Sequence, residues 1–246
     1  MNTSTRTLVV IPTYNERGLI TEVLNRLFAA IDSDVDVMVV DDASPDRTTD
    51  AIKHHPGARR ITLIERPAKL GLARAYLDAF DRALAEGYEF IVQMDADLSH
   101  DPEDIPRLLA ALGGAELVIG SRYVPGGRIE NWSGLRRTLS RSGNGYARGW
   151  FGWGVQDATS GFRALRADAL RAAALNTIRS EGYAFQIEMV FRLLQAGCRV
   201  IEVPITFIER RGGRSKLSRG IVLEALWRVP GWGLRYRFGG LRQPQR

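Results

Sequence analysis

The chain has 246 residues, of which 45% are hydrophobic and 25% are charged, and its formal net charge is +6. These values are ordinary for a folded soluble protein that can build a core. The single cysteine, Cys198, excludes a disulfide framework and a thiolate zinc cluster, which favours a reducing compartment and oxygen ligands for any metal.

The chain opens with a βαβ unit. Residues 7–11 and 35–40 are short, β-branched and nearly continuous in apolar character, as buried parallel strands are. Between them, apolar residues recur every three or four positions from 19 to 28, which predicts an amphipathic helix. Residues 1–6 lack the charged, apolar and small-residue regions of a secretory signal, so export by that route is not expected.

The same pattern repeats through residue 120. Strands are predicted at 60–64, 89–94 and 117–120, and helices at 71–86 and 102–112. This alternation predicts an α/β fold, with an open, mostly parallel sheet and helices on both faces. Because ligands bind at the carboxyl ends of the strands in such sheets, the residues that follow the strands are expected to form one crevice.

The second half of the chain is less regular. Residues 122–157 are rich in Gly, Arg, Trp and Ser, which indicates loops, one helix at about 135–150 and a place for an acceptor site. A helix at about 185–195 and a strand at 198–203 follow.

Positive charge is concentrated after Pro204. An anionic partner is therefore expected, and the candidates are nucleotide diphosphates, anionic lipid and nucleic acid. Residues 210–216 are predicted to form a mobile basic loop. We expect one catalytic domain over residues 1–217, followed by a basic, amphipathic and membrane-proximal tail over residues 218–246.

The tail has two interpretations. Residues 221–232 mix apolar bulk with tryptophan and arginine, which suits a membrane interface. The alternative is a helix packed on the domain or on a membrane-embedded partner. Charged residues and Pro230 interrupt the apolar stretch, so no membrane span is expected.

Asp95 and Asp97 lie one residue apart at the end of the strand predicted at 89–94. Two carboxylates so close repel each other unless a positive charge lies beside them. Mg²⁺ and Mn²⁺ favour carboxylate and phosphate oxygens, so the pair predicts a metal site beside a nucleotide diphosphate. The alternative is a solvated turn before a helix capped by Asp101.

Polar clusters also end the first two strands. Asp41 and Asp42 are placed to accept hydrogen bonds from a base or a ribose hydroxyl, with an Asx turn as the alternative. Residues 12–16 supply a ring and an acid able to border a nucleotide, unless Asn15 simply caps the next helix. Polar clusters at all three strand ends are less expected by chance than as parts of one site, so together they favour a nucleotide site.

Other titratable residues are given mainly structural interpretations. Glu188 is interpreted as part of a helix face or an ion pair and not as a base, and His54 and His55 as a helix end. His100 is a candidate for the metal shell.

Several short segments form a combined pattern: 12–17 (PTYNER), 40–46 (VDDASPD), 69–72 (KLGL), 94–100 (MDADLSH), 120–123 (GSRY) and 159–163 (TSGFR). Together they resemble the family-2 inverting glycosyltransferases of type A (GT-A) fold. Later segments make the resemblance closest to the polyprenol-phosphate (dolichol-phosphate) mannose synthases. They are 185–189 (FQIEM), 203–207 (VPITF) and 215–217 (SKL). The resemblance extends from about Leu8 to about Leu217 and implies a Rossmann-like, nucleotide-sugar-binding domain.

The donor implied by this resemblance is GDP-mannose. The residues implied to hold its guanosine end are Pro12, Tyr14, Glu16, Val40 and Asp42. Asp95 and Ala96 are implied to lie along the nucleotide, and Asp97 to be the principal ligand of Mg²⁺ or Mn²⁺. Some relatives place a metal-binding Gln where this chain has Ser99, which leaves the second ligand position to Asp95 or water.

The acceptor implied by the resemblance is a polyprenyl monophosphate. A phosphate monoester is already an oxyanion near neutral pH, so it can attack the anomeric carbon without a strong general base. Arg122, Arg136 and Ser140 are the candidates for holding it. Arg210 and Lys216, together with Arg122, are implied to surround the phosphates of the departing GDP. Displacement would invert the α-linked donor to a β-mannosyl phosphate.

The basic loop at 210–216 is expected to close over the diphosphate when donor and metal bind. We expect a peripheral enzyme at the cytoplasmic face of a membrane, recruited by its tail or by a membrane-embedded anchor subunit. Another donor, such as UDP-glucose, is the alternative within the class. A nucleic-acid-binding basic module is a remote alternative, because no nucleic-acid motif is recognised and strand-end carboxylates would repel phosphates that lack a metal.

Overall fold

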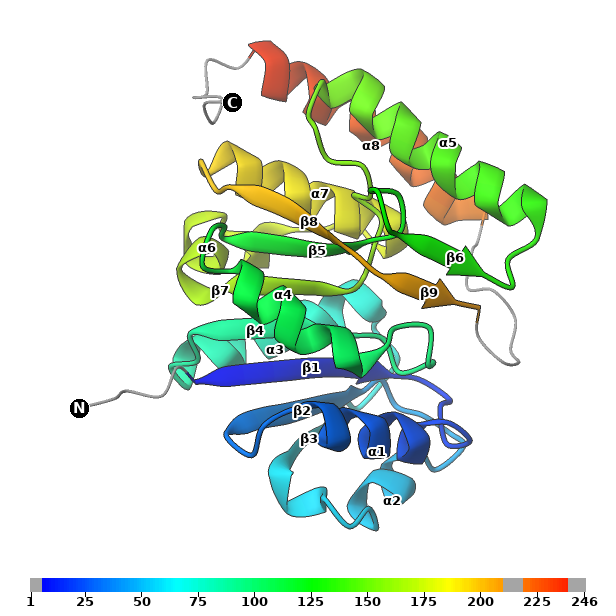
Figure 1. Cartoon of the computed structure of the whole chain (residues 1–246), viewed down its shortest axis with the longest axis vertical. Helices are drawn as coiled ribbons and strands as arrows, with labels where there is room; N and C mark the ends of the chain where they lie inside the picture. The colour runs from blue at the N-terminus through cyan, green and yellow to red at the C-terminus, as the bar shows by residue number, and fades with distance from the viewer. Residues whose placement is uncertain (1–5, 210–218, 239–246) are drawn as a thin grey trace.

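Strands and helices alternate along the chain in the computed structural model, which describes residues 6–209 and 219–238 (Figure 1). The strands are β1 (Thr7–Thr13), β2 (Val35–Asp41), β3 (Ile61–Glu65), β4 (Phe90–Gln93), β5 (Leu117–Ser121), β6 (Arg128–Glu130), β7 (Arg163–Arg166), β8 (Val200–Pro204) and β9 (Thr206–Ile208). The helices are α1 (Ile20–Ala30), α2 (Thr48–Lys53), α3 (Leu72–Ala85), α4 (Ile105–Ala111), α5 (Gly134–Phe151), α6 (Ala167–Ala172), α7 (Gly182–Gln195) and α8 (Arg219–Phe238). Short 3₁₀ helices lie at Ala58–Arg60, Pro102–Asp104 and Leu175–Thr177.

One seven-stranded sheet has the order β3-β2-β1-β4-β7-β5-β8. Its neighbouring strands are parallel except at β7, which runs antiparallel to both β4 and β5. β1 is buried along its whole length, as a strand covered on both faces must be. The predicted open, mostly parallel sheet is confirmed. β7 was not predicted, because it is short and has an arginine at each end.

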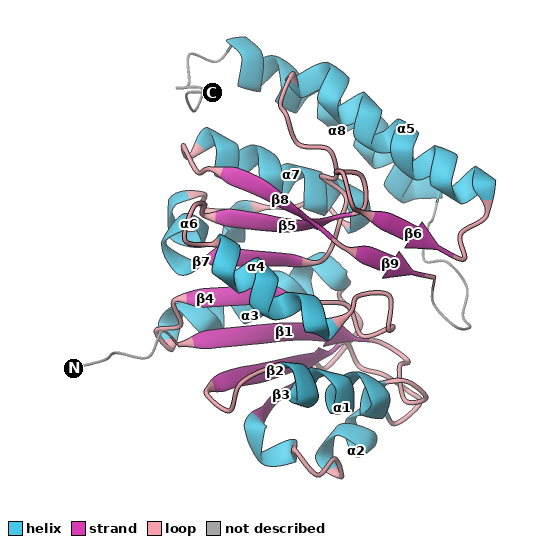
Figure 2. Cartoon of the chain, viewed as in Figure 1, coloured by secondary structure: helices cyan, strands magenta, loops and turns pink. Residues whose placement is uncertain are grey.

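Helices cover both faces of this sheet (Figure 2). Successive side chains of β1 point to opposite faces, so they enter different cores. Leu8 and Val10 belong to the core that α3, α6 and α7 cover, and Val9 and Ile11 belong to the core beneath α1 and α4. This alternation is what makes the strands almost continuously apolar.

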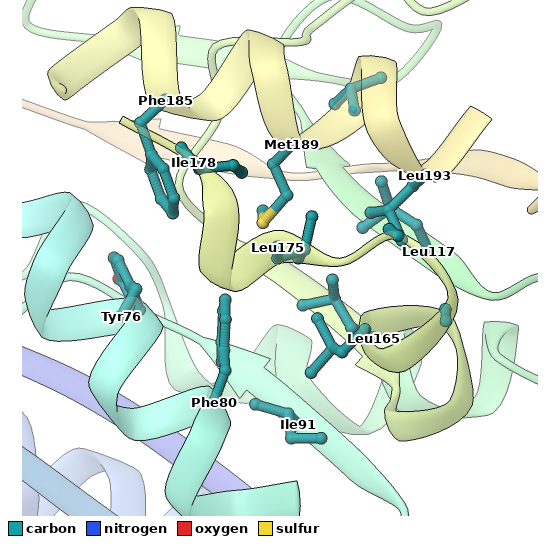
Figure 3. Close-up of a cluster of buried hydrophobic side chains, with 14 of the residues drawn as sticks. Tyr76, Phe80, Ile91, Leu117, Leu165, Leu175, Ile178, Phe185, Met189 and Leu193 are labelled. Carbon is teal, nitrogen blue, oxygen red and sulfur yellow. The ribbon is translucent and has the colours of Figure 1, made fainter. Parts of the chain in front are cut away.

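The larger core joins α3 to α7. In Figure 3, Tyr76 and Phe80 from α3 lie on the opposite side of the core from Phe185 and Met189 of α7. The rings of Tyr76 and Phe185 are stacked with their centroids 6.3 Å apart. This packing fixes the first turns of α7, where Gln186 faces the cavity described below.

The C-terminal helix α8 packs against α5 and α7 at one end of the molecule (Figure 1). Val229 is fully buried, and the ring of Trp232 stacks on Phe191 at 6.2 Å, whereas Trp227 is 87% exposed. Packing on the domain, one of the two interpretations of the tail, therefore holds for the inner face of α8. Among the helices of residues 6–209 and 219–238, none is long and apolar enough to cross a membrane.

Three features of the structure differ from the expected elements. Asn15 does not cap α1, which begins at Ile20 without a side-chain cap. The helix predicted at 102–112 is a 3₁₀ helix followed by α4, and Asp101 accepts a hydrogen bond from the Glu103 N–H at 3.1 Å. The two-stranded sheet of β6 and β9, which was not predicted, lies beyond the carboxyl ends of β5 and β8 (Figure 1).

Candidate active site

A cavity of about 470 Å³ lies at the carboxyl ends of the strands. It runs from the end of β2, which we call the β2 end, to the residues around the start of α5, which we call the α5 end. The predicted site residues in its wall are Pro12, Tyr14, Glu16, Asp42, Asp95, Ala96, Asp97, Arg122 and Arg136. The strand-end clusters therefore converge on one site, as the sheet topology predicts.

At the β2 end, Asp42 organises the loop before α3. Its Oδ1 accepts hydrogen bonds from Arg66 at 3.0 Å and from the Leu70 N–H at 2.8 Å, and its Oδ2 accepts one from the Gly71 N–H at 2.8 Å. Gly71 has φ of 98°, a conformation that glycine adopts without strain. Beside this loop, the ammonium group of Lys69 lies 3.7 Å from the ring centroid of Tyr14.

Two neighbours of Asp42 point elsewhere. Asp41 accepts hydrogen bonds from the Thr13 hydroxyl at 2.9 Å and from the Ser44 backbone N–H at 2.8 Å, so this residue holds the turn after β2, as the structural alternative expects. The side chain of Val40 is fully buried in the core and does not line the cavity. Any contact of Val40 with a nucleotide is left to its main chain and stays a prediction.

The segment Asp95-Ala96-Asp97 lies in the middle of the cavity wall. Asp97 Oδ1 accepts hydrogen bonds from the backbone N–H of Ser99 at 3.1 Å and from its hydroxyl at 2.5 Å. Asp95 Oδ1 accepts one from the Tyr76 hydroxyl at 3.3 Å. A Cβ atom added at Gly161 would lie 3.3 Å from Asp95 Oδ2, so glycine lets the opposite wall approach this carboxylate.

These two carboxylates fit a hard divalent cation. Both line the same cavity, and the hydrogen bonds that Ser99 donates to Asp97 use only Oδ1. Within the described part of the chain, no group of three histidine, cysteine, aspartate or glutamate side chains forms a complete metal site. A magnesium or manganese ion bound here would need further ligands from phosphate or water, which is how Mg²⁺ usually binds.

His100 is buried beneath this segment. Its ring stacks on Phe162 with a centroid distance of 4.9 Å, and its Nδ1 accepts the Asp95 N–H at 3.2 Å. Burial lowers the pKa of His100, which keeps the ring neutral at physiological pH. The structure therefore gives His100 a role in holding the backbone of Asp95.

At the α5 end, Arg122 is bound to a carboxylate that was not predicted. Asp157 accepts hydrogen bonds from Arg122 Nε at 2.7 Å, from Arg122 Nη2 at 2.6 Å and from the Arg122 backbone N–H at 2.9 Å. Both side chains are almost fully buried. Burial opposes ionisation of Asp157, but the Arg122 guanidinium holds the pKa of this carboxyl below its ordinary value.

The second predicted arginine, Arg136, is also paired. Its Nη1 lies 2.6 Å from Glu209 Oε1, and both residues line the cavity. Ser140 accepts a hydrogen bond from the Tyr123 hydroxyl at 2.7 Å and is not in the wall of the cavity. Its predicted contact with a phosphate stays a prediction. Arg210 and Lys216, and with them the expected loop closure, lie outside the described residues.

Arg163 is a buried arginine for which no role was predicted. It is fully buried, and its guanidinium donates to the carbonyl oxygens of Ala158 at 2.7 Å, Ser160 at 2.8 Å and Gln186 at 3.2 Å. Burial lowers its pKa to about 9, so it remains protonated at neutral pH. Arg163 ties the turn that carries Gly161 to α7. The only sequence feature that pointed to Arg163 was the segment 159–163, which is part of the family resemblance.

Further wall residues had no individual predicted role. They are Lys69, Trp132, Glu181, Tyr183, Gln186, Phe207 and Glu209, among others. Lys69, Gln186 and Phe207 nevertheless lie in segments that carry the family resemblance, and Trp132 lies in the stretch expected to hold the acceptor. The structural interpretation of Glu188 is confirmed, since it accepts hydrogen bonds from Ser180 at 2.6 Å and Arg192 at 2.9 Å. His54 and His55 directly follow α2, as expected for a helix end.

The fold resembles that of solved glucosyl-3-phosphoglycerate synthase structures from Mycobacterium tuberculosis. One, in complex with Mn²⁺, UDP-glucose and phosphoglyceric acid, has a TM-score of 0.68 and 20% identity, and covers 92% of this chain and 80% of that chain. Another, in complex with Mg²⁺ and UDP, has a TM-score of 0.69 and 19% identity, and covers 93% of this chain and 80% of that chain. At such identity the likeness concerns the fold alone.

Three relatives are similar over most of this chain. An undecaprenyl-phosphate mannosyltransferase of Micrococcus luteus is 49% identical over 238 residues, which are 96% of this chain and 98% of the relative. A polyprenol monophosphomannose synthase of Mycolicibacterium smegmatis is 45% identical, over 96% of this chain and 90% of the relative. A dolichol-phosphate mannosyltransferase of Pyrococcus furiosus is 37% identical, over 89% of this chain and 61% of the relative. Residues 8–173 match the family described as glycosyl transferase family 2. The chain therefore belongs to glycosyl transferase family 2.

Proposed function

We propose that this chain transfers mannose from GDP-mannose to a polyprenyl monophosphate, with inversion at the anomeric carbon. Relatives named for mannosyl transfer to polyprenyl phosphates are 45% and 49% identical to it over 96% of its length. The observation that carries the proposal is a single cavity that has strand-end carboxylates along one part and arginines at the other. Such a cavity suits a metal-bound diphosphate beside a second phosphate.

The donor would occupy the β2 end and the middle of the cavity. Tyr14 and Asp42 border the space for the nucleoside, and Asp97, with Asp95 beside it, would hold Mg²⁺ or Mn²⁺. When bound, the cation supplies charge neutralisation to the diphosphate leaving group. The protein contributes the carboxylates and their orientation. Ser99 donates two hydrogen bonds to Oδ1 of Asp97, which hold this carboxylate in place.

The acceptor phosphate would occupy the α5 end and act as the nucleophile. Its charge removes the need for a strong base, which agrees with the neutral, buried His100 and with the ion-paired Glu188. Arg122 and Arg136 would orient it by charge-assisted hydrogen bonds.

The lipid acceptor implies contact with a membrane surface. The exposed apolar side chains on α5 and α8 include Leu135, Leu139, Leu226 and Trp227. In Figure 1 these two helices lie together at one end of the molecule. We infer that this face meets the cytoplasmic side of a membrane, directly or through a membrane-embedded anchor subunit.

The test is turnover with purified components. GDP-mannose, a short polyprenyl phosphate and Mn²⁺ should give a mannosyl lipid, and chelation of the metal should stop its formation. A parallel reaction contains UDP-glucose in place of GDP-mannose. A glucosyl lipid formed in place of a mannosyl lipid would overturn the proposed donor and leave the class of reaction standing. No glycolipid with either donor would overturn the proposal.

A further inference from the structure

Trp132 lies in the cavity wall with a buried hydrogen-bond donor that has no partner. The residue is 8% exposed, and its indole Nε1–H has no hydrogen-bond acceptor among the described residues. A buried N–H of this kind is costly unless something accepts from it. An indole can only donate, so the missing partner must be an acceptor atom.

The chain holds this indole rigidly. Asn131 has φ of 61°, which turns the main chain sharply after β6, and Ser133 then caps α5 by accepting the Arg136 N–H. The indole packs edge-to-face against Phe207 with a centroid distance of 5.3 Å. Trp132 is therefore fixed in place before any ligand binds.

The surroundings of the indole select an anion. The guanidinium carbon of Arg136 lies 4.5 Å from the ring centroid of Trp132, and that of Arg122 lies 5.4 Å from it. Arg136 Nε is a second buried donor without a partner in the described part of the chain. The unused N–H groups of Trp132 and Arg136 suit an oxyanion better than a neutral hydroxyl, even though the two guanidinium groups also pair with Asp157 and Glu209.

The position favours the phosphate of a lipid over the phosphates of a nucleotide. Trp132 is at the α5 end, across the cavity from Tyr14 and Asp42. The first turns of α5, directly after Trp132, expose Leu135 (74%) and Leu139 (50%). A phosphate bound at Trp132 therefore has apolar surface beside it, which suits an attached hydrocarbon chain.

We propose that the indole Nε1–H of Trp132, together with Arg136 Nε–H, binds the phosphate of the lipid monophosphate acceptor. This inference rests on the proposed function for the identity of the acceptor. Trp132 is thus a residue that binds the acceptor. Its neutral N–H donates a directional hydrogen bond to the phosphate, which the arginines attract by their charge.

The substitution Trp132→Phe removes the N–H and keeps an aromatic ring. The dissociation constant of farnesyl phosphate should rise about 10-fold or more, as expected for loss of a hydrogen bond to a charged group. Trp153→Phe is the matched control, because Trp153 is also 8% exposed with an unpartnered Nε1 but does not line the cavity. Titration calorimetry without any donor sugar should show unchanged affinity in the control. Equal affinities in the two variants would overturn the proposal.

The wild-type chain provides a second readout. With ¹⁵N-labelled tryptophan, five indole signals are expected, and the one missing from Trp132→Phe is that of Trp132. This signal should shift with farnesyl phosphate and stay in place with farnesol. A shift with GDP and Mn²⁺ but not with farnesyl phosphate would overturn the inference. Because these measurements involve no turnover, binding without mannosyl transfer would refute the proposed function and leave the site intact.

Discussion

The two ends of the cavity hold their charged side chains in different ways. At the β2 end, Asp42 accepts hydrogen bonds from two backbone N–H groups as well as from Arg66. At the α5 end, Arg122 and Arg136 are each paired with a carboxylate from a distant part of the chain. The β2 end is thus organised largely by the main chain, and the α5 end by pairs of side chains.

This difference has an energetic consequence. Backbone donors remain when a side chain is replaced, and they are less costly to leave unpaired than an ion is. A buried arginine that loses its carboxylate becomes an uncompensated charge in a medium of low dielectric constant. We therefore expect substitutions of carboxylates at the α5 end to affect stability most where the pair is buried.

The largest effect is expected for Asp157→Ala. Arg122 and Asp157 are 4% and 0% exposed, so the substitution should lower the free energy of unfolding by about 3–5 kcal/mol. Urea unfolding followed by circular dichroism would measure it. Glu65→Ala breaks the half-exposed pair with Lys53 and should cost less than about 1 kcal/mol. Similar losses in both variants would show that burial does not set the cost.

The next effect is on turnover, from Asp97→Asn. The amide keeps an oxygen that can accept from Ser99 but loses the charge that would hold the cation, so kcat/KM should fall roughly 100-fold or more with little change in stability. Asp101→Asn is the matched control, since Asp101 caps a 3₁₀ helix and asparagine caps as well. Retained, metal-dependent turnover in Asp97→Asn would remove this residue from the metal site.

A smaller effect on stability is expected for Asp42→Ala. Arg66 keeps a second carboxylate, Asp78, at 3.1 Å, so it is not left unpaired. The loss should be about 2 kcal/mol, the cost of the unsatisfied N–H groups of Leu70 and Gly71. The KM for GDP-mannose should rise while that for the lipid phosphate stays constant. A loss as large as that of Asp157→Ala would contradict the contrast between the two ends.

The contrast also explains what the sequence could predict. The β2 end and the middle of the cavity are built from βα units, where a short apolar run followed by Asp41-Asp42 or Asp95-Ala96-Asp97 is a local pattern. Parallel pairing then brings these strand ends together, so their convergence follows from the fold class. Val40 shows the limit of that reasoning, because the alternation of side chains along β2 directs it into the core.

The α5 end was less predictable because its contacts are long-range. Asp157 is 35 residues from Arg122, and Glu209 is 73 residues from Arg136. No periodicity links such residues, and the antiparallel strand β7, which lies between β4 and β5, is too short to give a pattern. The composition of residues 122–157 indicated a place for an acceptor, but not which side chains would face one another.

The smallest effect is expected for Glu209→Gln, which tests whether an internal carboxylate competes with the acceptor. Glu209 and Arg136 are 32% and 29% exposed, so their pair is screened by solvent and worth little. Removing the charge should make Arg136 more available and lower the KM for the lipid phosphate by about 2- to 5-fold. Steady-state kinetics at saturating GDP-mannose would measure this change.

Glu130→Gln is the control for this prediction, because Glu130 is an exposed glutamate on the neighbouring strand β6, and it should leave the KM unchanged. A higher KM in Glu209→Gln would mean that the carboxylate positions Arg136 for the acceptor, as Asp157 positions Arg122, and the two pairs of the α5 end would then serve the same purpose.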